Sequence, residues 1–113
     1  MQFLALIYNT EGADDVDMST LMEQYGAFTH AVQEAGVMVA GDALQAVSTA
    51  TSVRVRNGKM ELTDGPFAET KEQLGGYYLL ECKDLDEAIH WASLIPSARY
   101  GTIEVRPVMV FDH

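Results

Sequence analysis

Apolar residues along this chain recur with two periods, and these periods predict the order of strands and helices. Phe3–Tyr8 is apolar at consecutive positions, as in a strand that is covered on both faces. The polar, acidic segment 9–17 is predicted to be a loop. After it, apolar residues lie three or four positions apart, which predicts a helix that begins at Ser19 or Thr20 and ends at Gly36. The apolar stripe of this helix comprises Leu21, Tyr25, Phe28, Val32 and Ala35.

The middle of the chain carries the signal of a β-hairpin. A second strand is predicted at Val37–Leu44, with Gly41 as a bulge or a point of close backbone approach. Further on, Asn57-Gly58 is the dipeptide that two-residue type I′ turns prefer, and it separates Ser52–Arg56 from Lys59–Thr63. This turn predicts four cross-strand pairs: Val53-Leu62, Val55-Met60, Arg54-Glu61 and Arg56-Lys59. The apolar pairs share one face and the charged pairs the other, so we expect a half-buried hairpin.

The last third of the chain predicts a loop, a strand, a helix and a final strand. The loop spans Asp64–Gly76 and the strand Tyr77–Cys82. Asp84–Glu87 has the pattern of a capped helix start, and Pro96 is expected to end that helix. Thr102–Pro107 alternates polar and apolar residues as a strand does. The buried stripe of the second helix is expected to comprise Leu85, Ala88, Ile89, Ala92 and Ile95.

The element order is therefore β-α-β-β-β-β-α-β, within one domain that spans residues 1–113. We expect an α+β fold in which one sheet carries both helices on the same face, as in a ferredoxin-like sandwich. The other face of the sheet still carries apolar side chains, because Phe3–Tyr8 and Tyr77–Leu80 are apolar in both directions. A second copy would bury that face, so a homodimer with facing sheets is expected.

Charge removes several classes of function. The chain has 7 Lys and Arg against 17 Asp and Glu, a net charge of −10, and none of its basic residues precedes Arg54. Such a surface repels phosphate, so binding to nucleic acid or to an anionic membrane is not expected. The apolar run Phe3–Tyr8 follows no basic residue and is too short to span a membrane, so a cytoplasmic protein is expected.

Histidine and cysteine offer little catalytic chemistry in this sequence. His30 and His90 fall on the polar sides of their predicted helices, and we expect them, together with His113, to be incidental. Cys82 is the single cysteine and lies in a strand-like run, so it is expected to be a buried apolar residue. Metal-ligand spacings and nucleotide-binding motifs are absent, so neither a metal nor a cofactor is expected.

The loop Asp64–Gly76 is the segment with the most candidate chemistry. Its length is unusual for a compact domain, and Asp64 is suited to hold a turn while Phe67 anchors the loop by burial. Thr70 and Gln73 have the spacing of a capping box, which favours a short helical turn. The loop is either a structural or dimer-contact element or a ligand site. In the second case its charged residues would position a polar ligand: Glu69, Lys71 and Glu72.

A longer string makes the chain resemble a known family. The nine residues DGPFAETKE at Asp64–Glu72, with VAGDALQ before them and DEAIHWASLIP after them, are similar to the DGPF branch of the YCII-related family. The resemblance implies a dimeric α/β-barrel, and members of this branch are often encoded beside extracytoplasmic-function sigma factors. The wider family carries a proposed acid-base dyad, a His on the first helix and an Asp near the end of the second. The matching positions here are Tyr25 and Ile95, which puts dyad chemistry in doubt, and His30 is no substitute.

Two functions remain open from the sequence. The first is a dimer that binds a small molecule, with Tyr25 as a phenolic hydrogen-bonding group and Asp42 as a candidate base. Asp64 would assist this acid-base chemistry, and the substrate would contact Lys71, Phe67, Glu69 and Glu72. The second is a non-catalytic dimeric accessory protein linked to transcription by an extracytoplasmic-function sigma factor. The first requires a partly apolar cavity bordered by several of these side chains.

Overall fold

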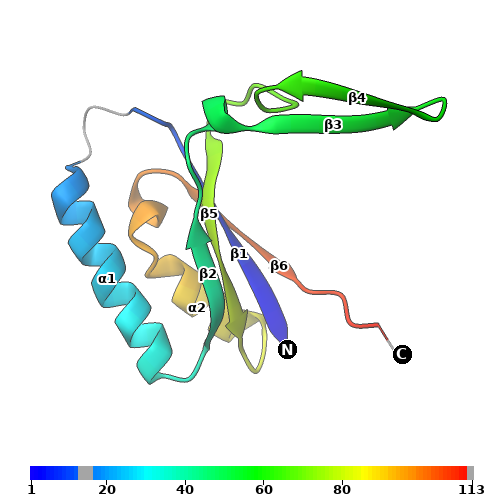
Figure 1. Ribbon diagram of the computed structural model, residues 1–113. Helices are drawn as coiled ribbons and strands as arrows, with labels where there is room; N and C mark the ends of the chain where they lie inside the picture. Colours follow the sequence, from blue (N-terminus) through cyan, green and yellow to red (C-terminus); the bar gives the residue numbers. More distant parts are fainter. Residues whose placement is uncertain (13–16, 112–113) are drawn as a thin grey trace.

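A four-stranded antiparallel sheet with two helices on one face forms the body of the protein (Figure 1). The computed structural model describes residues 1–12 and 17–111. The body comprises β1 (Gln2–Asn9), α1 (Met18–Glu34), β2 (Met38–Ala43), β5 (Gln73–Glu81), α2 (Leu85–Ser93) and β6 (Thr102–Pro107).

The sheet has the strand order β2-β5-β1-β6, and β1 is a central strand as its sequence predicts. Without the elements between β2 and β5, the chain reads β-α-β-β-α-β, so the expected α+β, ferredoxin-like fold class is confirmed. Phe3, Ala5 and Ile7 alternate along β1 and are buried on the side of the helices. The residues between them lie on the opposite side, which we call the open face. Its apolar side chains are half-buried: Leu4, Leu6, Tyr77 and Leu79.

Polar side chains fix the ends of both helices. Asp17 caps α1, where Ser19 or Thr20 had been expected, because its carboxylate accepts the backbone N–H of both residues at 3.0 and 3.5 Å. Hydrogen bonds, first of all from the Ser19 hydroxyl, lower the pKa of Asp17. Gly36 follows α1 with φ +71°, as expected of a C′ residue. Asp84 caps α2 by accepting the Glu87 N–H at 2.9 Å, which confirms the predicted capping pattern.

The predicted hairpin forms with the expected register, but it is not part of the main sheet. Among the residues that the structure describes, β3 (Thr51–Arg56) and β4 (Lys59–Asp64) pair only with each other, so the expectation of one sheet is wrong. Asn57 and Gly58 have φ of 54° and 73°, as a type I′ turn requires. A short 3₁₀ turn, η1 (Val47–Thr49), leads the chain away from the end of β2, and the hairpin projects from the body (Figure 1). Its apolar face is exposed and not half-buried, because the rest of the described chain does not cover it.

Two further expectations between β2 and β5 need correction. The loop after β4 is shorter than predicted, since β5 already begins at Gln73. This loop, residues 65–72, contains no helical turn. Thr70 and Gln73 do interact, but the Gln73 side-chain amide donates to the Thr70 carbonyl at 2.6 Å and no helix follows. The irregularity in β2 lies at Val39, whereas Gly41 provides the close approach to β5.

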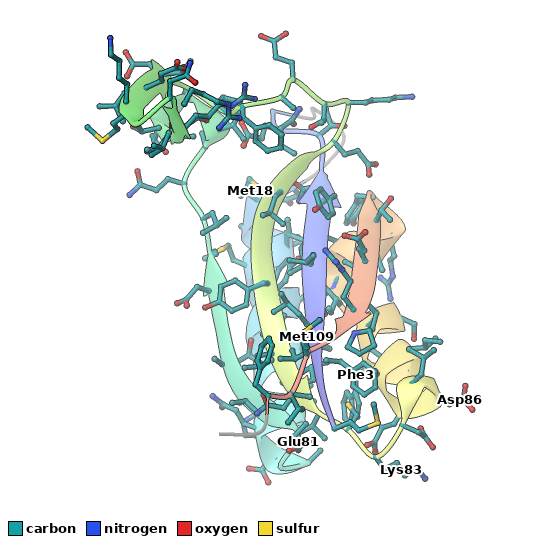
Figure 2. The ribbon with its side chains drawn as sticks, turned by 90° about the vertical axis from the view of Figure 1, so that its right-hand side faces the viewer. Phe3, Met18, Glu81, Lys83, Asp86 and Met109 are labelled. Carbon is teal, nitrogen blue, oxygen red and sulfur yellow. The ribbon has the colours of Figure 1, made fainter. Side chains whose placement is uncertain are left out.

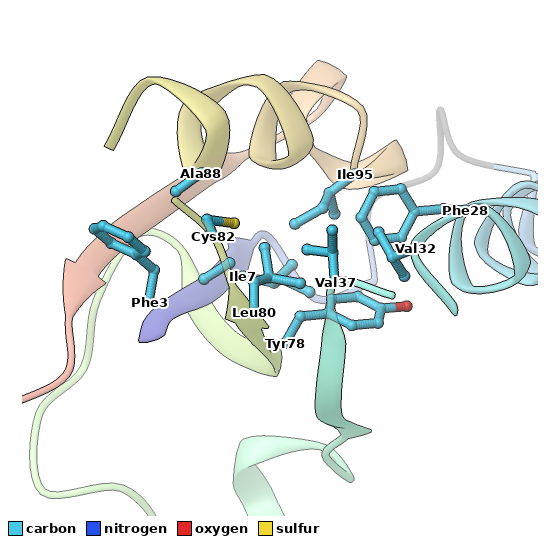
Figure 3. Packing of buried hydrophobic residues seen from close by; sticks show 11 residues of the cluster. Phe3, Ile7, Phe28, Val32, Val37, Tyr78, Leu80, Cys82, Ala88 and Ile95 are labelled. Carbon is cyan, nitrogen blue, oxygen red and sulfur yellow. The ribbon is translucent and has the colours of Figure 1, made fainter. Parts of the chain in front are cut away.

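Apolar side chains from both helices and the sheet meet in one core (Figure 3). In α2 only Ala88 and Ala92 are buried, whereas Leu85 and Ile89, expected in the buried stripe, are about half exposed. Small residues on its inner face let α2 lie close to the sheet, so its larger side chains point outward. The core cluster comprises Phe3, Ala5, Ile7, Phe28, Val32, Val37, Tyr78, Leu80, Cys82, Ala88 and Ile95.

Candidate functional site

A pocket of about 360 Å³ lies between α1 and the sheet. Met22 and Tyr25 line it from the helix, Ile7 from β1 and Met38 from β2. Backbone forms part of the wall, because Gly41, Gly75 and Gly76 also line the pocket. The pocket is mostly apolar and has the size of a site for a small organic molecule.

Two pairs of hydroxyl groups line this pocket, whose polar lining residues also include Asn9 and Asp42. The Tyr25 hydroxyl donates to Ser97 Oγ at 2.6 Å, and the Thr29 and Tyr78 hydroxyls share a hydrogen bond of 2.8 Å. Burial raises the pKa of Tyr25, so its phenol keeps its proton at neutral pH. Since the Tyr25 hydroxyl is the donor of this hydrogen bond, the Ser97 hydroxyl can donate its own hydrogen to another acceptor.

The local fold explains why these four hydroxyls meet. Tyr25 and Thr29 are four residues apart on α1 and therefore face the same way. Tyr78 reaches Thr29 from β5, and its ring packs edge-on against Phe28 with 5.0 Å between centroids. Its hydroxyl points out of the core toward α1 (Figure 3).

Ser97 is a site residue that sequence matching missed. The position matched to the family's second dyad member, Ile95, is only 1% exposed and packs in the core. The residue that contacts Tyr25 lies two positions further on, in the 3₁₀ turn η2 (Pro96–Arg99). Pro96 signals the end of a helix, but no sequence pattern indicates which side chain of the next turn faces α1.

Asp42 borders the pocket, but its carboxylate is held on the open face of the sheet. Asp42 lies directly opposite Tyr77 in the register, and the Tyr77 hydroxyl donates to its Oδ2 at 2.7 Å. Tyr78 faces the helices, so its neighbour Tyr77 faces the other way. This hydrogen bond to the carboxylate raises the pKa of Tyr77. Tyr25 and the Asp42 carboxylate are thus separated by the sheet and do not form an acid-base pair.

The loop residues expected to bind a ligand do not line this pocket. Asp64 ends β4, opposite Thr51. Phe67 is 81% exposed, so it does not anchor the loop by burial as expected. It borders a separate cleft of about 220 Å³ next to the polar face of the hairpin. The charged residues Glu69, Lys71 and Glu72 also lie outside the pocket, and their part in ligand binding stays a prediction.

The histidines of the described chain lie on the surface, as expected. His30 is exposed, with Nε2 3.7 Å from the Glu34 carboxylate, and His90 is exposed on α2 with its ring edge-on to Trp91. His113 lies outside the described residues. Within residues 1–12 and 17–111, no three His, Cys, Asp or Glu side chains form a group that could hold a metal ion.

The thiol of Cys82 is buried, as the sequence predicts. Burial first, and the carboxylates of Glu87 and Glu81 second, raise the pKa of this thiol. We therefore expect an aromatic disulfide reagent at pH 7.5 to react slowly with the native protein and within seconds after denaturation. Absorbance of the released thiolate measures both rates. Equally fast reaction of the native protein would contradict the buried position.

Comparison with known proteins shows which family the chain belongs to. The model of the YCII-related domain matches residues 1–112. The chain belongs to the YCII-related family. An uncharacterized protein of Rhizobium meliloti is 34% identical to this YCII-related chain over 117 residues, which cover 98% of the chain and 94% of the relative.

A solved structure supports the fold of this YCII-related protein. The 5-chloro-2-hydroxyhydroquinone dehydrochlorinase of Burkholderia phenoliruptrix, in complex with 2,5-dihydroxybenzoquinone, is similar with a TM-score of 0.56 and 13% identity. The match covers 96% of this chain and 94% of the dehydrochlorinase.

No helix in the described part of the chain is long and apolar enough to cross a membrane.

Proposed function

We propose that this YCII-related protein is a dimer that binds a small, flat, oxygen-bearing molecule in the pocket between α1 and the sheet. The observation that carries the proposal is the pocket itself, with mostly apolar walls and four hydroxyl groups: those of Tyr25, Thr29, Tyr78 and Ser97. Apolar walls supply affinity, and a few placed polar groups orient the ligand.

The wall chemistry favours an aromatic ligand. Met18, Met22 and Met38 line the pocket, and thioether sulfur makes favourable contacts with aromatic rings. The Ser97 hydroxyl and the Thr29-Tyr78 pair can each exchange a hydrogen bond with a ring hydroxyl or carbonyl. The dehydrochlorinase of similar fold was solved with 2,5-dihydroxybenzoquinone, a ring of this kind, which supports the choice.

Binding is better supported than acid-base catalysis. The phenol of Tyr25 is protonated at neutral pH and already donates to Ser97, so it is not a base there. The Asp42 carboxylate is engaged by Tyr77 on the other face of the sheet. A ligand in the pocket would therefore meet neutral donors and acceptors, which suits recognition of a phenol or a quinone.

Thermal shift with hydroxylated rings tests this function. We expect 2,5-dihydroxybenzoquinone or catechol to raise the melting temperature of the protein, and cyclohexane-1,2-diol, which is not flat, to raise it much less. Thr29→Val removes one pocket hydroxyl and is expected to weaken binding by about fivefold, the equivalent of one hydrogen bond of roughly 1 kcal/mol. Isothermal titration measures the affinities.

Thr63→Val is the matched control, because Thr63 is an exposed threonine of the hairpin, away from the pocket. It should bind each ring as tightly as the unchanged protein. If no oxygenated ring stabilises the protein at millimolar concentration, the proposed function is wrong. Equal weakening by Thr29→Val and Thr63→Val would instead remove the pocket as the binding site.

A further inference from the structure

The hairpin Thr51–Asp64, here called the arm, presents an apolar face that residues 1–12 and 17–111 leave uncovered. Cross-strand pairing places Val53 opposite Leu62 and Val55 opposite Met60. All four side chains lie on one face and are between 58% and 67% exposed. A two-stranded hairpin without a packed face is marginally stable in water, so the arm needs a partner surface.

The other face of the arm already has a neighbour within the chain. The cleft beside it is lined by Arg54 and Glu61 of the arm and by Pro66 and Phe67 of the following loop. The Ser52 hydroxyl donates to the Gly65 carbonyl at 2.9 Å, which holds this loop to the base of the arm. The loop thus packs beside the polar face of the arm, and the apolar face is free to contact a partner.

The arm extends on the side of the sheet opposite the helices. In Figure 1 the helices lie to the left of the sheet, and both the arm and the C-terminal segment after β6 extend to its right. Figure 2 looks onto the open face, with the helices behind it. The C-terminal segment is also apolar and exposed at Met109, Val110 and Phe111. The arm, the open face and this segment therefore border one region on this side of the sheet.

Charge favours a second copy of this chain as the partner. The arm holds three of the seven Lys and Arg residues, Arg54, Arg56 and Lys59, and two acidic ones, a net charge of +1, whereas the 42 residues before Ala43 contain seven acidic residues and neither Lys nor Arg. The net charge of −10 opposes close approach of two copies, and contact through a segment of positive net charge reduces that repulsion. The same chain supplies both halves of this complementarity, as a symmetric dimer requires.

We propose that the arm docks its apolar face on a second copy and is the element that holds the dimer together. This inference rests on the dimer of the proposed function and specifies how that dimer is held. The apolar pairs supply the affinity, and the basic residues, which lie on the opposite face of the arm, attract the acidic body of the partner over a longer range. The open faces of the two sheets lie between the two arms.

Sedimentation of the full chain tests the arm. For the unchanged protein we expect a mass of twice 12.4 kDa at 10 µM. Val55→Ser combined with Met60→Ser removes two apolar side chains from each arm and is expected to raise the dissociation constant at least about a hundredfold. Arg56→Glu combined with Lys59→Glu should also weaken the dimer, most strongly at low salt.

Glu61→Gln, on the polar face of the same arm, is the matched control and should leave the dimer intact. Far-UV circular dichroism and thermal unfolding check that each variant keeps the body folded, and hydrogen exchange should show arm amides protected only in the dimer. An unchanged dissociation constant after Val55→Ser with Met60→Ser would overturn the proposed role of the arm but not the dimer itself. A monomer for the unchanged protein at 100 µM would overturn the dimer as well, whereas ligand titration of that monomer tests the pocket separately.

Discussion

Gly101→Ala is expected to lower the free energy of unfolding by about 3 kcal/mol, because the site has no room for a Cβ atom. A Cβ at Gly101 would overlap the backbone carbonyl oxygen of Tyr8 and would lie 3.0 Å from the Cα of Asn9. Both neighbours are backbone of the central strand β1, which cannot move aside as a side chain does. Urea unfolding followed by circular dichroism measures the change.

Gly26→Ala is the matched control for this prediction. Gly26 lies inside α1 with no atom near the position of its missing Cβ, so alanine should stabilise the protein by about 0.5 to 1 kcal/mol. The two variants make the same chemical change, and we expect opposite signs. A Gly101→Ala protein as stable as the unchanged one would show that β1 and the turn before β6 are not packed as described.

Ile95→Asp is expected to have the largest effect, a loss of about 4 kcal/mol or more at pH 7. It places the family's second dyad residue at its matched position, but that position is 1% exposed and surrounded by apolar side chains such as Phe28 and Val32. The carboxylate would be buried without a partner, and its pKa in the folded state would rise. The folded state then binds the proton more tightly than the unfolded chain, so stability should be highest at acid pH and fall as pH rises.

Ile95→Val controls for loss of volume and should cost about 1 kcal/mol at either pH. The difference between the two variants should therefore shrink between pH 7 and pH 4. Thermal unfolding at both pH values measures this difference. A folded, stable Ile95→Asp protein at pH 7 would mean that this position reaches solvent or a partner group.

Local patterns predicted the elements of this fold well. The final strand Thr102–Pro107 has the predicted bounds, and the turn at Asn57-Gly58 fixes the pairing of the hairpin as expected. The N-cap of α2 and the end of α1 follow from residues within four positions of each helix terminus. These features depend on neighbours along the chain, which the sequence displays directly.

Features that depend on distant contacts were predicted less well. The pattern of Val53 and Leu62 indicates that one hairpin face is apolar, but it does not say whether the same chain covers that face. Asp42 and Tyr25 both suit a site by residue type, and only the register of β2 against β5 shows that the Asp42 carboxylate lies behind the sheet. Ser97 became part of the site through packing of η2 against α1, which no periodicity predicts.

The strand pairing of the body also has a consequence for the order in which the chain folds. β1 pairs with β5 and β6, so Phe3 meets Leu80 and Pro107. The strands of the main sheet are far apart in the sequence, so long loops must close before they pair, and folding of such a sheet is slow. A hairpin with a tight turn forms within about 1 to 10 µs. On a growing chain the residues of the hairpin leave the ribosome before those of β6. Its apolar strip is therefore exposed before the body exists, and we expect the like charges of Arg54, Arg56 and Lys59 to oppose pairing between such segments.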